Sequence, residues 1–223
     1  MSELQLLVAH LVKLGLVALL TGMVVRGRLG LCWTFGLYVL AILVGNTLVT
    51  LAPQRFYTPS FWVLKQGVYD VLKMAIAIEL TWRAFAAFPG AWRTARVVLL
   101  VLLVTGALFL AWLTPRSSFH TLAEWQPGVV TAAVWLLTAT ALLVVFYQVP
   151  IGDWQRAIML GLAPYLLVFV TWLSLLRSYG WALRTEVSLI DALAYLGVVL
   201  FWARAAWRRD APGFAAAPAQ SPA

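Results

Sequence analysis

Long apolar runs, separated by short polar breaks, repeat along the whole chain. A bilayer core is about 30 Å thick, so a spanning helix needs about 20 mostly apolar residues. The breaks carry residues that favour turns, such as Pro89-Gly90 and Gln126-Pro-Gly128. The pattern predicts an all-α polytopic membrane protein, built as a bundle of seven transmembrane helices. The expected spans are 4–25, 31–51, 61–88, 97–113, 129–147, 157–176 and 187–207.

The composition excludes a soluble domain. Of the 223 residues, 63% are apolar and 11% are charged, and the mean hydropathy is +0.91, whereas soluble domains carry about 25% charged residues. A transmembrane β-barrel would alternate apolar and polar positions, which the run 97–104 does not. We therefore expect one transmembrane domain over residues 1–209 and a disordered, low-complexity tail over 210–223.

The arginines predict the orientation of the chain. The membrane side reached after the first, third, fifth and seventh spans holds nine arginines, and the other side holds four. Because cytoplasmic loops are enriched in basic residues, the N-terminus should lie outside and the C-terminus in the cytoplasm. The expected partners of this +8 chain are the bilayer, with anionic lipids at the inner face, and a membrane or cytoplasmic protein, but no nucleic acid. The inner arginines are Arg26, Arg28, Arg83, Arg93, Arg96, Arg156, Arg204, Arg208 and Arg209.

Polar residues inside the predicted spans form a second pattern. Ionisable groups in a bilayer are costly, so they face the bundle interior or an aqueous cavity. At about 1.5 Å per residue, Lys13 and Asp70 lie about 13 Å below the outer ends of their spans, and Lys65 and Asp191 about 6 Å. Nearly all the costly groups therefore fall in the outer half of the membrane. The candidate ligand-binding or ion-pair cluster is His10, Lys13, Asn46, Lys65, Tyr69, Asp70, Lys73, Asp191 and Tyr195.

The third predicted span carries more of these groups than any other span. Helical spacing places its polar residues in a stripe from Lys65 toward its inner end, which should face the first, second and seventh spans. We expect two ion pairs between spans, Lys13–Asp70 and Lys65–Asp191. Three interpretations stay open: pairs that only hold helices together, a solvated pocket or ion path open to the outside, and lysines that snorkel without a partner.

Two short motifs in the same span favour a structural role over catalysis. Glu79 and Arg83 are spaced i,i+4 and predict a structural ion pair. The same ExxxR spacing occurs in intramembrane prenyl-protein proteases, but these need more histidines than the two present here. Tyr69-Asp70 is similar to the YD motif of intramembrane aspartyl proteases, but their GxGD motif is missing. With a single cysteine as well, we expect no catalytic residue, no metal site and no cofactor.

The topology resembles that of one known group. Seven helices, an outward N-terminus and a basic inner end with Arg204, Arg208 and Arg209 resemble the seven-helix sensor regions of bacterial histidine kinases. They are also similar to small uncharacterised seven-helix bacterial membrane proteins. The resemblance covers the whole chain, carries no diagnostic motif, and implies a sensing or scaffolding role in the inner membrane. Because no output domain follows Arg209, such a sensor would signal through a separate partner.

Three functions follow as hypotheses. The first is a non-enzymatic membrane protein whose polar, outward-facing intramembrane site senses or binds a small or anionic ligand and acts through a partner. Three lysines against two aspartates, with a titratable His10, favour an anionic or pH-dependent ligand. The second is a transporter or channel for a small solute or ion. The third is an accessory subunit of a membrane protein complex.

Overall fold

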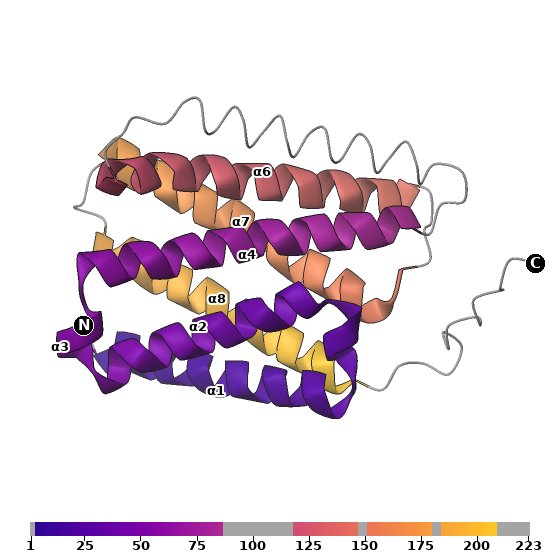
Figure 1. Cartoon of the computed structure of the whole chain (residues 1–223), viewed down its shortest axis with the longest axis horizontal. Coiled ribbons are helices and arrows are strands. Elements are labelled where there is room, and N and C mark those ends of the chain that lie inside the picture. Colours follow the sequence, from indigo (N-terminus) through magenta and orange to yellow (C-terminus); the bar gives the residue numbers. More distant parts are fainter. Residues whose placement is uncertain (1–2, 87–117, 147–150, 180–183, 209–223) are drawn as a thin grey trace, which may run out of the picture.

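The computed structural model describes residues 3–86, 118–146, 151–179 and 184–208. Within these ranges the chain forms helices and short turns, and no strand. The expected span at 97–113 and the expected tail at 210–223 lie outside the described residues. The helices are α1 (Glu3–Val25), the 3-10 helix η1 (Arg28–Leu31), α2 (Trp33–Leu51), α3 (Pro53–Phe56), α4 (Pro59–Ala86), α6 (Ser118–Phe146), α7 (Asp153–Tyr179) and α8 (Arg184–Trp207) (Figure 1).

Among the described helices, five are long and apolar enough to cross a membrane, namely α1, α2, α6, α7 and α8. Their outer surfaces expose large apolar side chains, including Leu14 at 67% and Val145 at 76%. Lipid tails are as apolar as leucine, so this exposure carries no penalty in a bilayer. The helices therefore identify a multi-pass membrane protein.

Helix α4 differs from these five in composition. Its 28 residues are enough to span a bilayer, but its charged side chains lower its hydropathy. Helices α2 and α6 both pack against it, and one of its faces is thereby shielded. Its limits lie two residues from those expected at each end. The charged residues of α4 are Lys65, Asp70, Lys73, Glu79 and Arg83.

The helix limits follow the apolar pattern except at α6. The break expected at Gln126-Pro-Gly128 does not occur, because α6 is continuous from Ser118 to Phe146. Proline inside a membrane helix is tolerated, since neighbouring groups satisfy the carbonyl that it frees. Helix α7 likewise continues through Pro164. A proline that would end a helix in water is thus a poor guide to helix ends here.

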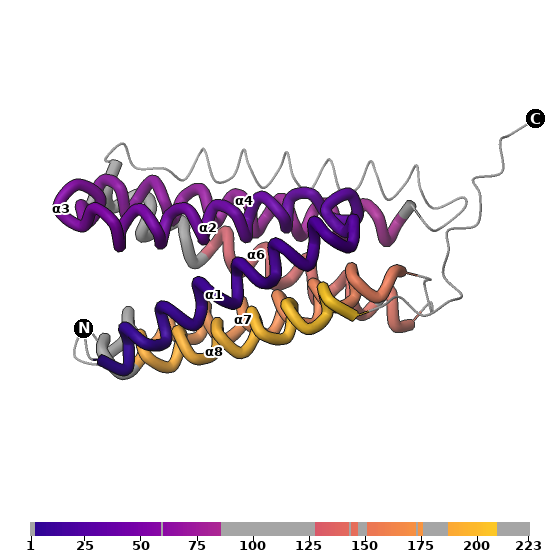
Figure 2. The backbone as a smooth tube through the Cα atoms, turned by 90° about the horizontal axis from the view of Figure 1, so that it is seen from below, coloured from indigo at the N-terminus to yellow at the C-terminus, as the bar shows by residue number. Residues whose placement is uncertain are grey.

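The bundle has two sides, which are joined by α1 and by α6. Figure 2 shows α7 and α8 along one side and α2 and α4 along the other. Helix α1 packs against α8 and also reaches α2, while α6 packs against both α4 and α7. In Figure 1 α1, α4, α6 and α8 run in one direction and α2 and α7 in the other, with α7 and α8 oblique to α4. Helices far apart in sequence, such as α1 and α8, are therefore direct neighbours.

Glycines allow the close approach of α8 to its two neighbours. Gly15 of α1 faces the side chain of Val199, and Gly161 of α7 faces the indole of Trp202. A Cβ atom at either glycine would overlap the facing side chain. The indole of Trp202 also donates a hydrogen bond to the carbonyl of Ala157 at 3.2 Å. Small residues at such crossings are the usual means of packing membrane helices closely.

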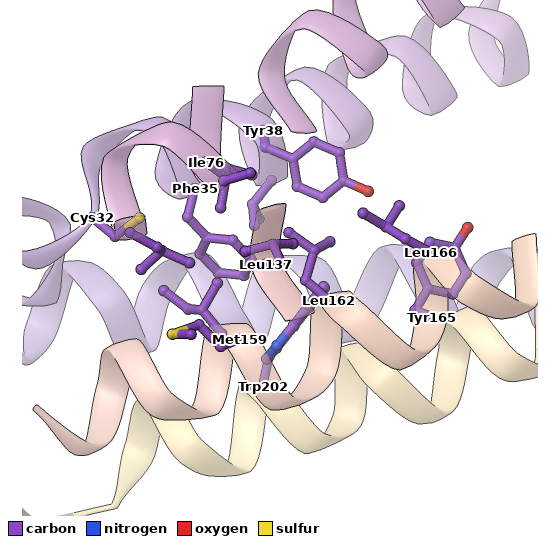
Figure 3. Packing of buried hydrophobic residues seen from close by; sticks show 14 of the residues in the cluster. Cys32, Phe35, Tyr38, Ile76, Leu137, Met159, Leu162, Tyr165, Leu166 and Trp202 are labelled. Atoms are coloured by element: carbon purple, nitrogen blue, oxygen red, sulfur yellow. The ribbon is translucent and has the colours of Figure 1, made fainter. Parts of the chain in front are cut away.

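The buried core is aromatic near its centre. The ring of Phe35 lies edge-on to those of Trp154 and Trp202, with centroids 5.7 and 4.9 Å away. Edge-to-face contacts of this kind stabilise beyond their buried area. Figure 3 shows that Tyr38 and Tyr165 lie at the opposite end of this core from Cys32. Their hydroxyl groups mark where the apolar core gives way to polar side chains.

Candidate functional site

A buried ion pair on α4 is the centre of the candidate site. The ammonium Nζ of Lys73 lies 2.9 Å from Oδ1 of Asp70, and the two side chains are only 5% and 7% exposed. The amide of Gln66 also donates to Oδ1 of Asp70, at 3.4 Å. The other carboxylate oxygen, Oδ2, is buried without a hydrogen-bond partner. The pair is i,i+3 on one helix, a spacing that brings side chains together without help from another helix.

The expected Lys13–Asp70 pair is not formed. Lys13 instead donates a hydrogen bond of 2.6 Å to the hydroxyl of Thr50, near the end of α2. The reason lies in the packing of the helices, because α1 lies against α8 and α2, whereas α4 lies against α2 and α6. Lys13 therefore meets α2, and Asp70 finds its cation on its own helix.

The expected Lys65–Asp191 pair is not formed either. The ammonium of Lys65 lies 5.9 Å from the centroid of the Tyr69 ring, and its stem packs beside Gly45. Asp191 lies within electrostatic range of Lys73 instead, and its Oδ1 is buried without a hydrogen-bond partner. Equal depth from helix ends implies contact only for parallel helices, and α8 runs obliquely to α4 (Figure 1).

Four tyrosines surround the two aspartates. Ring centroids lie 6.5 Å apart for Tyr38 and Tyr69, and 5.2 Å apart for Tyr165 and Tyr195. Tyr38 and Tyr165 lie within electrostatic range of both aspartates. The hydroxyl of Tyr195 approaches that of Tyr38 without the geometry of a regular hydrogen bond. We call this group the Lys73 cluster, and its members are Tyr38, Tyr69, Asp70, Lys73, Tyr165, Asp191 and Tyr195.

The Lys73 cluster is assembled from four helices, with Tyr38 on α2 and Tyr165 on α7 completing groups on α4 and α8. Sequence reasoning named the members on α4 and α8 but missed these two tyrosines. Each is a single phenol inside an apolar run, which is the signal that would have found it. The ring of Phe169 on α7 adds an apolar wall, 4.6 Å from the Lys73 ammonium.

The remaining predicted residues lie outside this cluster. His10 is on an exposed face of α1, and Lys13 bonds to Thr50. Asn46 is half-buried on α2, where its backbone carbonyl accepts the Thr50 hydroxyl at 2.8 Å. Lys65 lies over Tyr69, the cluster member nearest to it in α4. The charge of the cluster is thus one lysine against two aspartates, not three lysines against two.

Glu79 and Arg83 form the expected i,i+4 ion pair, with an oxygen–nitrogen distance of 2.8 Å. The pair also has a role that the spacing did not predict. The second oxygen of Glu79 accepts the backbone N–H of Thr34 at 3.1 Å and its hydroxyl at 2.5 Å. A carboxylate at a helix N-terminus satisfies free N–H groups and meets the positive end of the helix dipole. Glu79 thereby caps α2 from α4.

Cys32 sits beside this cap, buried at the start of α2. Its sulfur lies 3.6 Å from the Glu79 carboxylate. Burial, with the nearby negative charge of Glu79, raises the pKa of the Cys32 thiol to about 12. The thiol is therefore protonated and unreactive at neutral pH.

Arg28 has a buried structural role instead of the head-group contact expected of a loop arginine. Gly27, at φ +65°, turns the chain after α1 in a conformation that suits glycine. Arg28 then reaches the last turn of α8, where it donates hydrogen bonds to the carbonyls of Ala205 and, at 2.6 Å, Arg208. Its guanidinium also lies 5.6 Å from the centroid of the Trp154 ring. A cation at these carbonyls complements the negative end of the helix.

The chemistry available to the Lys73 cluster is binding and proton exchange. In the described ranges no three His, Cys, Asp or Glu side chains converge as a metal site would require. The cluster offers carboxyl oxygens, phenols and one ammonium, which bind cations, protons or hydrogen-bonding solutes. The chain matches no protein-family model, and neither a curated protein nor a solved structure matches it.

Proposed function

We propose that the chain is a non-enzymatic, seven-span protein of a bacterial inner membrane, with its N-terminus outside and its C-terminus in the cytoplasm. Its function is to bind a small ligand at the Lys73 cluster from the outer side. Binding then alters the packing of α8 and signals to a partner protein. The basic inner loops support this orientation, because they hold most of the arginines.

One observation carries the proposal. Two carboxyl oxygens, Oδ2 of Asp70 and Oδ1 of Asp191, are buried without hydrogen-bond partners inside the helix bundle. Buried polar groups that only hold helices together are expected to be satisfied, because an unmade hydrogen bond costs about 1–3 kcal/mol. Groups left incompletely satisfied are typical of sites that a ligand completes. The cluster therefore supports a binding role better than a purely structural one.

The charge balance of the cluster also bears on the ligand. With one lysine and two aspartates, its described ionisable groups favour a proton or a cationic ligand over an anion. Of the two kinds of ligand expected from the sequence, a pH-dependent one therefore suits the cluster and an anionic one does not.

Access from the outside tests the binding role. In a Cys32→Ser chain, Asp191→Cys should react with a membrane-impermeant methanethiosulfonate reagent applied to the outer side of cells. Leu162→Cys, whose position is fully buried in the core, is the matched control and should not react. Protection of both positions would show a sealed cluster and would contradict the proposal.

The free energy of unfolding of a variant distinguishes a residue that binds a ligand from one that only holds helices together. Asp191→Leu removes a buried oxygen that lacks a partner, so the free energy of unfolding should stay constant or rise by about 1 kcal/mol. A loss as large as that of Asp70→Leu would mean that Asp191 holds the bundle together, and would refute a binding role for it.

A further inference from the structure

The two aspartates of the Lys73 cluster are held in different ways, and this difference bears on what occupies the site. Asp70 has two donors on Oδ1, the Lys73 ammonium at 2.9 Å and the Gln66 amide at 3.4 Å. Asp191 lies within electrostatic range of the same ammonium but forms no ion pair with it, and its Oδ1 has no hydrogen-bond partner. Asp70 is therefore the ionised counterion of Lys73, and Asp191 is the group without one.

The surroundings of Asp191 supply no second positive charge among the described residues. On α4 it faces Lys73, and on α2, α7 and α8 the nearby titratable groups are Tyr38, Tyr165 and Tyr195. Phenols are neutral at physiological pH. Among the described side chains Lys73 is the one charge that influences Asp191, and the titratable residues of α1 do not act on it. They are Glu3, His10 and Lys13.

Charge neutrality then determines the occupant. If both aspartates were ionised, the cluster would hold one positive and two negative charges in a medium that penalises net charge strongly. A single proton on Asp191 removes the excess, and the balance is simple: the carboxylate of Asp191 takes a proton from outer-side water to form the neutral acid. A metal cation would neutralise the same charge, but it would have to approach the Lys73 ammonium, which repels it.

We propose that the ligand of the Lys73 cluster is a proton, bound by Asp191 and exchanged with the outer side of the membrane. This inference rests on the proposed function and names the occupant of that site. The unpartnered Oδ2 of Asp70, on a residue only 5% exposed, supports it independently, because it leaves the Asp70 carboxylate able to accept a hydrogen bond from a protonated partner or a water.

Infrared spectroscopy of the full chain in lipid tests the proposal. The wild type at neutral pH should show the carbonyl band of a protonated carboxylic acid, shifted in deuterium oxide and lost reversibly as the pH is raised. The isosteric Asp191→Asn variant should lack this band. Asp153→Asn, which changes an exposed aspartate in the first turn of α7, is the matched control and should keep it. Asp70→Asn should also lose the band, because Asp191 then becomes the counterion of Lys73.

Three results would overturn the inference. The first is a wild-type spectrum without the band at any pH at which the protein is folded. The second is a band that persists in Asp191→Asn, since the proton would then reside elsewhere. The third is a band that vanishes when sodium replaces N-methylglucamine in the buffer, which would make a metal cation the ligand. A different result would refute the proposed function alone: Asp191→Cys does not react with the reagent applied outside, yet the wild type still shows the band. Asp191 would then be a protonated acid that does not exchange with the outer side.

Discussion

The buried Lys73–Asp70 pair can be dissected by a double-mutant cycle. The perturbations are Asp70→Ala, Lys73→Met and the two together, each measured as a change in the free energy of unfolding. Because both side chains are less than 10% exposed, removing one partner leaves the other charge in an apolar interior. Removing both leaves no charge to compensate. The pair should therefore show strong non-additivity.

The geometry sets the expected size. At 2.9 Å and an effective dielectric constant of about 20, the attraction between the charges is about 6 kcal/mol. Desolvation offsets most of this gain, so a buried pair that loses one partner costs about 3–5 kcal/mol. We expect the cost of Asp70→Ala to lie near the lower end of this range. Asp191 lies within electrostatic range of Lys73 and can release its proton to replace the lost counterion. Lys73→Met should cost less, since both carboxyls can then be neutral.

Steric trapping in lipid micelles is a suitable assay, because it reports unfolding without strong denaturants. The double variant should be more stable than the sum of the single losses predicts, by at least about 2 kcal/mol. The matched control is a cycle between Asp70→Ala and Lys13→Met, which should be additive because Lys13 binds Thr50. Additive losses for Lys73 and Asp70, or coupling between Lys13 and Asp70, would refute this account of the site.

Three further predictions concern the rest of the bundle. Thr34→Val removes the hydroxyl that donates to the Glu79 carboxylate, and should lower the free energy of unfolding by about 1 kcal/mol; unchanged stability would mean that this hydrogen bond does not stabilise the contact between α2 and α4. Cys32, with its pKa raised to about 12, should resist maleimide at pH 8 until the protein is denatured, and labelling at equal rates in both states would contradict its burial. Gly161→Val should destabilise by about 1–3 kcal/mol through overlap with the indole of α8. Gly197→Ala, which meets open space, is its control and should leave the midpoint of thermal unfolding unchanged or slightly higher.

The apolar helices were predictable from the sequence because a bilayer imposes a minimum length on each span. That constraint acts on single segments, so the limits of α1 and α8 follow from hydropathy alone. The continuous course of α6 through Pro127 was not predictable in this way. A helix continues through a proline where neighbouring groups compensate for the missing N–H, and a one-dimensional pattern does not contain those neighbours.

The site was predictable in its residue types and less so in its contacts. Lys73 and Asp70 are three residues apart on one helix, so their pairing needs only helical geometry. Partners on different helices depend on which helices are neighbours and on their crossing angles, and depth along a helix contains neither. Lys13 and Asp70 do not pair because α1 and α4 have different neighbours, and Lys65 and Asp191 do not because α8 is oblique to α4. Tyr38 and Tyr165 were missed because no charged residue lies within a helical turn of either, whereas Tyr69 and Tyr195 each lie within a turn of an aspartate.

The hydrogen bonds from Arg28 to Ala205 and Arg208 join segments separated by 177 and 180 positions in the chain. Helix α1 also packs along α8. During synthesis, α1 is inserted long before α8 exists, so the inward face that carries Leu16 and Leu19 waits for a partner that is made later. Closure of the bundle is therefore a late, post-insertion event, and a ribosome stalled before residue 184 would leave the earliest helix dependent on lipid or a chaperone to cover it.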